Sequence, residues 1–156
     1  MTATESVVSE APFIVRRTVK WGDCDPAGVV YTVTFGEYVI SAANLFYNHL
    51  LGARSADFKR AHGFRTPTRA LEFDFRRALW PDEVFEMTVS VHEIRSRTYV
   101  LEVMGRMATV GEDVFRAMLT PVCIARDERR AVDIPVPFRT ALERHRDTCR
   151  AVPAAT

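Results

Sequence analysis

The sequence predicts an α+β fold in which an antiparallel sheet wraps around one long central helix. The helix is expected at residues 35–51, where apolar side chains surround most of a helical circumference. Several later segments alternate apolar and polar residues with the period of a strand, and the short links between them favour an antiparallel meander. The helix is the one long partner available to the apolar face of that sheet, so wrapping the sheet around it is the economical packing.

Composition indicates one ordinary domain. The chain has 156 residues, 47% apolar and 26% charged, with a net charge of +1. A single domain over residues 1–156 is expected, with about 1–11 and 151–156 flexible. Near-zero net charge argues against a nucleic-acid partner, and no run approaches the ~20 apolar residues of a membrane span. The polar, acidic start is unlike a secretion signal, so we expect a cytoplasmic protein.

The first strand and the helix have recognisable boundaries. Before the helix, Phe13, Val15, Val19 and Trp21 alternate with polar residues, as in a half-buried strand. Thr34 and Glu37 have the spacing of a capping box at the helix start. Gly52 stands where a left-handed C-terminal cap belongs. The helix should therefore begin near Thr34 and end before Gly52.

The second half of the chain alternates repeatedly with period two. Strands are expected at residues 71–76, 85–92, from 99 to about 110 and from 114 to about 124, with a turn at 111–113. Residues 136 to about 149, which follow Pro135, form an amphipathic pattern that predicts a terminal helix.

Two carboxylates lie in the turn-rich segment between the first strand and the helix. Asp23 and Asp25 belong to the run Trp21-Gly22-Asp23-Cys24-Asp25-Pro26-Ala27-Gly28-Val29-Val30-Tyr31. A carboxylate beside a helix start stays ionised, and the free N–H groups there can hold a developing oxyanion. This segment is the predicted chemical centre.

The run from Gly22 to Tyr31, followed by an aromatic-rich helix, closely resembles the 4-hydroxybenzoyl-CoA thioesterase family of hotdog-fold acyl-CoA thioesterases. Thr66-Pro67 matches the start of the family's second strand, and residues 93–99, Glu-Ile-Arg-Ser-Arg-Thr-Tyr, match its conserved hairpin pattern. The resemblance covers most of the chain. It implies a hotdog fold, acyl-CoA thioester hydrolysis without a metal or redox cofactor, and a homodimer or homotetramer with active sites between subunits.

The resemblance also assigns roles to residues. It implies that Asp25 is the catalytic carboxylate, as nucleophile or general base, and that the backbone N–H of Thr32 holds the carbonyl oxygen. Arg95, Ser96 and Arg97 match positions that the family uses for the phosphates of coenzyme A. Lying two residues apart at a strand junction, the two arginines are expected to point to the same side, where guanidinium groups bind phosphate well. The sequence departs from the family pattern at Val33-Thr34-Phe35, at the helix entry.

Simpler interpretations compete at several residues. Asp25 precedes Pro26 and is also a common turn former, and Asp23 is better explained as a turn cap than as a catalytic group. Two flanking carboxylates raise the pKa of Cys24, which favours a packing role over a nucleophile. Glu37 is a rival catalytic carboxylate, although the capping box explains it without catalysis.

Other chemistries find little support. Cys24, Cys123 and Cys149 lack the spacing of a zinc site or a disulfide framework, and no His in the loop supports a dehydratase. A non-catalytic acyl-CoA or acyl-carrier binding module, and a thioesterase for carrier proteins, remain alternatives. The acyl group stays open between aryl and short or medium aliphatic groups. Aromatic residues are available either for an acyl pocket or for the core: Trp21, Tyr31, Phe46, Tyr47 and Trp80.

Overall fold

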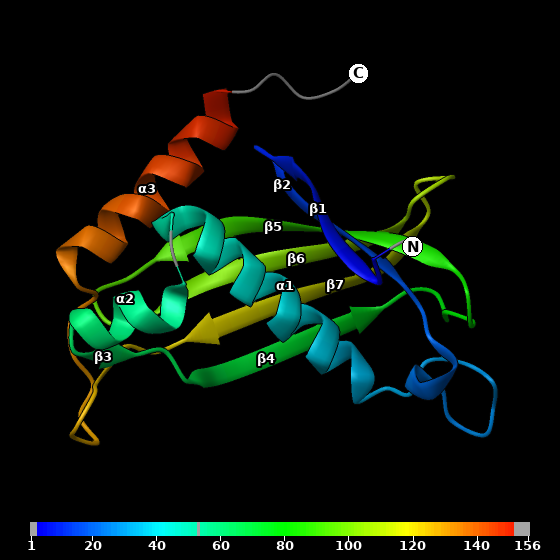
Figure 1. The fold of residues 1–156 in the computed structure, drawn as a ribbon, viewed down its shortest axis with the longest axis horizontal. Helices are drawn as coiled ribbons and strands as arrows, with labels where there is room; N and C mark the ends of the chain where they lie inside the picture. The colour runs from blue at the N-terminus through cyan, green and yellow to red at the C-terminus, as the bar shows by residue number, and fades with distance from the viewer. Residues whose placement is uncertain (1–2, 53, 152–156) are drawn as a thin grey trace.

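The computed structural model describes residues 3–52 and 54–151, and its main element is a six-stranded antiparallel sheet with one helix across it (Figure 1). The strand order is β1 (Glu5–Glu10), β2 (Phe13–Thr18), β5 (Val84–Ile94), β6 (Tyr99–Met107), β7 (Asp113–Pro121) and β4 (Thr68–Phe75). A small second sheet pairs β3 (Phe64–Arg65) with β8 (Ile124–Ala125). The helices are α1 (Thr34–Leu51), α2 (Ser55–Ala61) and α3 (Val136–Ala151), with a short 3-10 turn η1 (Trp21–Asp23). The predicted α+β architecture is confirmed.

The core lies between α1 and the sheet. Tyr38, Val39, Ala42 and Phe46 are fully buried on the sheet-facing side of α1. On the sheet, alternate residues of β5, β6 and β7 are buried, as period-two patterning requires. The opposite side of α1 is exposed and includes Ile40, so the apolar side chains around most of the helix, which would predict a helix buried on nearly all sides, are not all buried in the single chain.

The start of α1 differs from the predicted capping box. Val33 is the N-cap residue, and it makes no side-chain cap bond. The N–H groups of Thr34, Phe35 and Gly36 instead donate to the carbonyls three residues earlier, at 2.8, 3.3 and 3.0 Å. Because this preceding turn satisfies those donors, a side-chain cap is not needed. At the other end Gly52 has a φ of 61°, so the predicted left-handed cap is confirmed.

The expected flexible start is wrong for residues 5–10, which form the edge strand β1 paired with β2. Glu5 fixes this strand, because its carboxylate accepts from the Arg17 guanidinium at 2.7 Å and from the Ser41 hydroxyl at 2.7 Å. At the other terminus Ala151 belongs to α3, and the rest of the expected flexible end lies outside the described residues.

Three strands end earlier than predicted. β2 stops at Thr18, and Trp21 lies in η1 with its side chain 73% exposed. β6 ends at Met107, and β7 ends at Pro121, after which the chain crosses to pair β8 with β3. None of the helices in the described part of the chain has the length and hydropathy that a membrane span requires.

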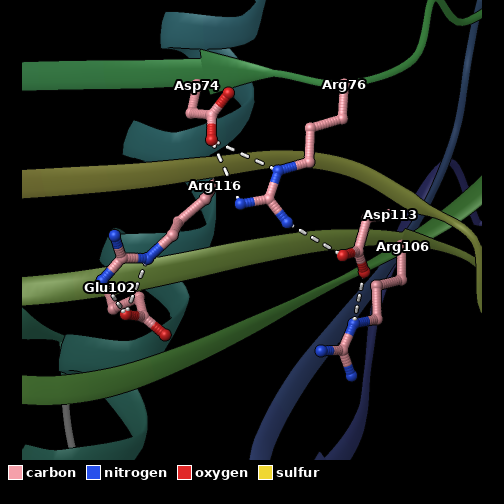
Figure 2. A network of polar contacts seen from close by, with 6 residues as sticks. All are labelled: Asp74, Arg76, Glu102, Arg106, Asp113 and Arg116. Carbon is pink, nitrogen blue, oxygen red and sulfur yellow. Dashed lines mark hydrogen bonds and ion pairs between the residues drawn. The ribbon is translucent and has the colours of Figure 1, made fainter.

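The face of the sheet away from α1 carries charges in pairs. Figure 2 shows Arg76 between Asp74 and Asp113, Arg106 on Asp113, and Arg116 on Glu102. Such exposed pairs contribute little to stability. They do distinguish the two faces of the sheet: the charged side chains lie on the face away from α1, and the apolar side chains of these strands lie on the face toward α1.

One close contact in this sheet gives a stability prediction. A Cβ added at Gly105 in β6 would lie 2.5 Å from the ring of Phe115 in β7. That ring is fully buried against Phe35 and Phe85, so it has no room to retreat. Gly105→Ala is expected to cost about 1–3 kcal/mol of the free energy of unfolding, measured by urea titration. Gly22→Ala is the control, because nothing lies within 4 Å of its added Cβ. Equal unfolding midpoints for the two variants would contradict the prediction.

Candidate active site

The site loop, residues 21–33, joins β2 to α1 and is closed by its own backbone bonds. Cys24 and Val30 form an antiparallel bridge, and Asp25 N–H donates to the Val29 carbonyl at 3.0 Å. Gly28 N–H donates to the Asp25 carbonyl at 2.9 Å, and its φ of 84° suits glycine. The loop is also joined to the segment before β5 by Val30 N–H and the Leu79 carbonyl, at 2.9 Å.

Asp25 lies at the start of this tight turn and is half-buried. Its Oδ1 accepts the N–H of Ala27 at 2.8 Å, which is the bond of an Asx turn. Among residues 3–52 and 54–151, its Oδ2 accepts no hydrogen bond. One carboxylate oxygen therefore holds the turn while the other is available to a substrate or a water molecule.

Asp23 serves the fold. Its Oδ2 accepts the Lys20 N–H at 3.0 Å and the Tyr38 hydroxyl at 2.8 Å, which confirms the predicted turn cap. Burial, and then the hydrogen bond to Asp23, raises the pKa of Tyr38 well above its usual value. The sequence reasoning missed Tyr38, and the one available signal was a hydroxyl on the core-facing side of an apolar helix.

Cys24 has the packing position that was predicted. Its side chain is partly buried against the core. Desolvation is the largest cause that raises the pKa of this thiol, followed by the charges of Asp23 and Asp25. The thiolate that a nucleophile needs is therefore disfavoured.

The helix entry offers N–H groups for a carbonyl oxygen. The turn before α1 satisfies residues 34–36, whereas the N–H groups of Thr32 and Val33 donate to no acceptor in the part of the chain that the structure describes. Thr32 is exposed. Its position thus suits the predicted oxyanion donor, and Val33 is a neighbouring second donor.

Glu37 becomes a stronger rival than the sequence indicated. It lies on the exposed side of α1, and its carboxylate has no hydrogen-bond or ion-pair partner within the described residues. Since the capping box is absent, the explanation that favoured a purely structural Glu37 no longer holds.

Arg95, Ser96 and Arg97 lie in the β5–β6 connection, far from the site loop of the same chain. The register pairs Thr18, just before the site loop, with Val84 at the start of β5, whereas Arg95 follows its end. The 11 residues of β5 span about 35 Å, so the two groups lie at opposite ends of the sheet (Figure 1).

The two arginines also face different carboxylates. Arg95 makes two bonds to Glu93, at 3.0 and 2.8 Å, which raise the pKa of Arg95 and lower that of Glu93. The Nε of Arg97 lies 3.6 Å from the Oδ1 of Asp133. The chain turns between β5 and β6, so strand alternation does not fix the relative direction of these two side chains, and their common direction stays a prediction. Ser96 uses its carbonyl to accept the Ile134 N–H at 2.9 Å.

The candidate acyl-pocket aromatics divide into two groups. Phe46 and Tyr47 are buried in the core. Trp21 and Tyr31 are exposed in the site loop, and Trp80 is exposed in the segment that Val30 joins to this loop. The exposed three are the ones placed to meet a ligand near Asp25.

An antiparallel sheet around a central helix, with an aspartate-bearing turn at the helix start, defines a hotdog-fold thioesterase. The Thioesterase-like superfamily model matches residues 19–142, and the chain belongs to this family. The expected family resemblance and enzyme class are confirmed.

The chain is similar in sequence to a curated relative and in fold to solved structures. A 1,4-dihydroxy-2-naphthoyl-CoA hydrolase of Gloeothece citriformis (strain PCC 7424) is 28% identical over 128 residues, 78% of this chain and 85% of the relative. A 1,4-dihydroxy-2-naphthoyl-CoA thioesterase structure from Synechocystis has a TM-score of 0.76 at 22% identity, covering 83% of this chain and 94% of its own. The 4-hydroxybenzoyl-CoA thioesterase structure from Pseudomonas sp. strain CBS-3 has a TM-score of 0.75 at 21% identity. The match covers 82% of this chain and 96% of that structure's chain.

Proposed function

We propose that the chain hydrolyses an aryl-CoA thioester to the free acid and coenzyme A, without a metal or redox cofactor. Two features of the site loop carry the proposal: a half-buried Asp25 whose Oδ2 accepts no hydrogen bond, and a helix entry whose Thr32 and Val33 N–H groups have no acceptor, both within residues 3–52 and 54–151. A base or nucleophile and an electrophilic donor are the two groups that thioester hydrolysis needs.

In the proposed reaction the Thr32 N–H holds the thioester carbonyl oxygen as negative charge develops on it. Asp25 then follows one of two routes. As a nucleophile it forms a mixed anhydride, the C–S bond breaks, coenzyme A leaves as the thiolate, and water cleaves the anhydride. As a general base it takes a proton from the water that attacks the carbonyl, and the thiolate leaves as the tetrahedral intermediate collapses.

Two observations favour an aryl acyl group over short or medium aliphatic groups. Trp21, Tyr31 and Trp80 offer exposed aromatic faces around the site loop, and such faces stack well on flat rings. The relatives named above act on hydroxynaphthoyl and hydroxybenzoyl thioesters.

A homodimer would complete the site. Among the strands of the described residues, β4 has no neighbour on its outer side, and its Phe73 and Phe75 rings stack at 5.0 Å on the α1 side. Antiparallel pairing of two β4 strands about a two-fold axis would place the site loop of one subunit at the far end of the other. Arg95, Ser96 and Arg97 would then hold coenzyme A phosphates for the partner's Asp25. A tetramer of such dimers and a cytoplasmic location stay predictions.

The test of this function is free-thiol release from benzoyl-, 4-hydroxybenzoyl-, 1,4-dihydroxy-2-naphthoyl-, acetyl- and hexanoyl-CoA. Higher kcat/KM for the aryl thioesters is expected. Preference for hexanoyl-CoA would overturn the acyl assignment. Binding of coenzyme A without turnover of any substrate would favour a non-catalytic binding module.

Reversing the charges of Arg95 and Arg97 in the β5–β6 connection distinguishes a coenzyme A substrate from a carrier-protein substrate. Arg95→Glu with Arg97→Glu is expected to raise KM for a CoA thioester about tenfold or more, because phosphate contacts to arginine are charge-assisted. A pantetheine thioester, which lacks the nucleotide, should keep its KM. An unchanged KM for the CoA substrate would remove these residues from the binding site, and faster turnover of a carrier-bound acyl group would favour the carrier alternative.

A further inference from the structure

A groove runs along the exposed side of α1. It begins at a hollow beside Val33, Glu37 and Ile40, next to the site loop. Ile40 and Asn44 also line a narrower hollow, which in turn shares Asn44, Lys59 and Thr66 with a larger one of about 600 Å³. Because neighbouring hollows share lining residues, they follow one another along α1 from the helix entry toward α2 and β3, and we call this row of hollows the groove.

The far end of this groove is strongly basic. We call it the basic hollow and define it by its four cations, Arg54, Lys59, Arg65 and Arg126. No carboxylate is among its lining residues, and none of the four cations forms an ion pair within residues 3–52 and 54–151. The chain as a whole has a net charge of only +1, so four uncompensated charges around one depression concentrate positive potential there.

The hollow has a fixed polar floor. Lys59 is half-buried, its ammonium donates to the Thr66 hydroxyl at 2.5 Å, and it lies 4.4 Å from the centre of the Tyr47 ring. Desolvation lowers the pKa of Lys59, and an anion beside it would favour the charged form again. Asn48 accepts the Ser55 N–H at 2.9 Å, which holds the start of α2 at the rim.

Two other arginines near this end, Arg60 and Arg95, already have carboxylate partners. Arg60, on the same helix as Lys59, lies 3.8 Å from Asp57, and Arg95 makes two bonds to Glu93. An entering phosphate would have to displace Glu93 from Arg95, whereas the basic hollow has no internal anion to displace.

We propose that the basic hollow binds the phosphate-bearing end of the CoA thioester, in addition to the hairpin arginines. This inference rests on the proposed function. Val33 and Asn44 are 11 residues apart on the helix, about 16 Å along its axis, a distance comparable to an extended pantetheine arm. In a two-fold dimer across β4 the two grooves run antiparallel, so the hollow would also lie beside the partner's site loop. Whether the thioester lies at the site loop of the same chain or at that of the partner subunit, its phosphates would reach the same four cations.

The test is calorimetric titration of the double variant Arg65→Gln, Arg126→Gln with coenzyme A and with pantetheine. Both side chains lie toward the surface and outside the core cluster, so the fold should persist. The Kd for coenzyme A is expected to rise about tenfold or more, with a shallower dependence on salt, while pantetheine binding stays unchanged. Arg60→Gln is the matched control, because it removes an arginine of α2 that does not line the hollow.

Other outcomes overturn the inference. An unchanged Kd for coenzyme A would do so, and if the same variant lost ADP or pyrophosphate binding, the hollow would belong to a separate phosphate ligand. An equal loss of coenzyme A affinity in Arg60→Gln would show that the effect comes from the overall positive charge of the protein and not from the basic hollow. The proposed function is judged separately by thiol release: turnover with an unchanged coenzyme A Kd in the double variant would reject only the hollow.

Discussion

Asp25→Asn is expected to lower kcat for thiol release by about 10³-fold or more. Asn cannot form the acyl anhydride and is a far weaker base, so either route loses its reacting group. The change is nearly isosteric, and the amide oxygen can still accept the Ala27 N–H that Oδ1 accepts at 2.8 Å. Because the turn is kept, the loss should appear in kcat more than in KM or in the melting temperature.

Two carboxylate variants make this result interpretable. Asp23→Asn removes the neighbouring charge, and since Asp23 bonds Lys20 and Tyr38, stability should fall while kcat changes much less. Glu37→Gln tests the rival carboxylate on the exposed side of α1. If Asp25→Asn kept wild-type kcat and Glu37→Gln lost it, the catalytic role would move to Glu37.

Phe75→Lys is expected to separate the proposed dimer and to lower activity with it. The Phe75 side chain is 45% exposed on the edge strand β4, beside Phe73 and Phe35. In a two-fold interface each substitution occurs twice, so the dimer Kd should rise about 100-fold or more. Sedimentation across a dilution series measures this constant, and thiol release at the same concentrations should fall about tenfold or more as monomer accumulates.

Val8→Lys is the matched control, because Val8 is 40% exposed on β1, the opposite edge strand. It adds the same charge while leaving β4 intact, so it should stay dimeric and active. A dimer that survives Phe75→Lys and dissociates with Val8→Lys would place the interface on β1. A fully active monomer would show that each chain carries a complete site.

Patterning and turn chemistry predicted most of the fold. The alternation of Phe85, Met87 and Val89 placed β5 with its buried face correct, because side-chain direction in a strand depends only on parity. Gly52 marked the end of α1 because its left-handed conformation is local. The site loop was located by its turn residues and by the family resemblance, and the structure shows Asp25 in a tight turn of the loop that precedes α1.

What was missed depends on tertiary partners. The edge strand β1 is short and polar, and it forms because Glu5 meets Arg17 and Ser41, which are distant in sequence. The predicted capping box does not form because backbone carbonyls of the preceding turn accept the N–H groups at the start of α1. The wide separation of Asp25 and Arg95 follows from the direction of β5 relative to β2. Spacing along a chain carries no information about which end of a sheet a loop occupies.

The bond between the Tyr38 hydroxyl and Asp23 has a consequence for how a substrate would be accepted. Asp23 also accepts the Tyr31 N–H through its carbonyl at 3.0 Å, so the segment that carries Asp25 is tied to the helix through Tyr38 and to the far end of the site loop through Tyr31. Folding has already restricted the torsions of this segment, and a ligand need not order it again. The conformational entropy cost of binding then falls on the ligand and on the exposed aromatic side chains, and the turn that holds Asp25, the proposed catalytic residue, is formed before any substrate arrives.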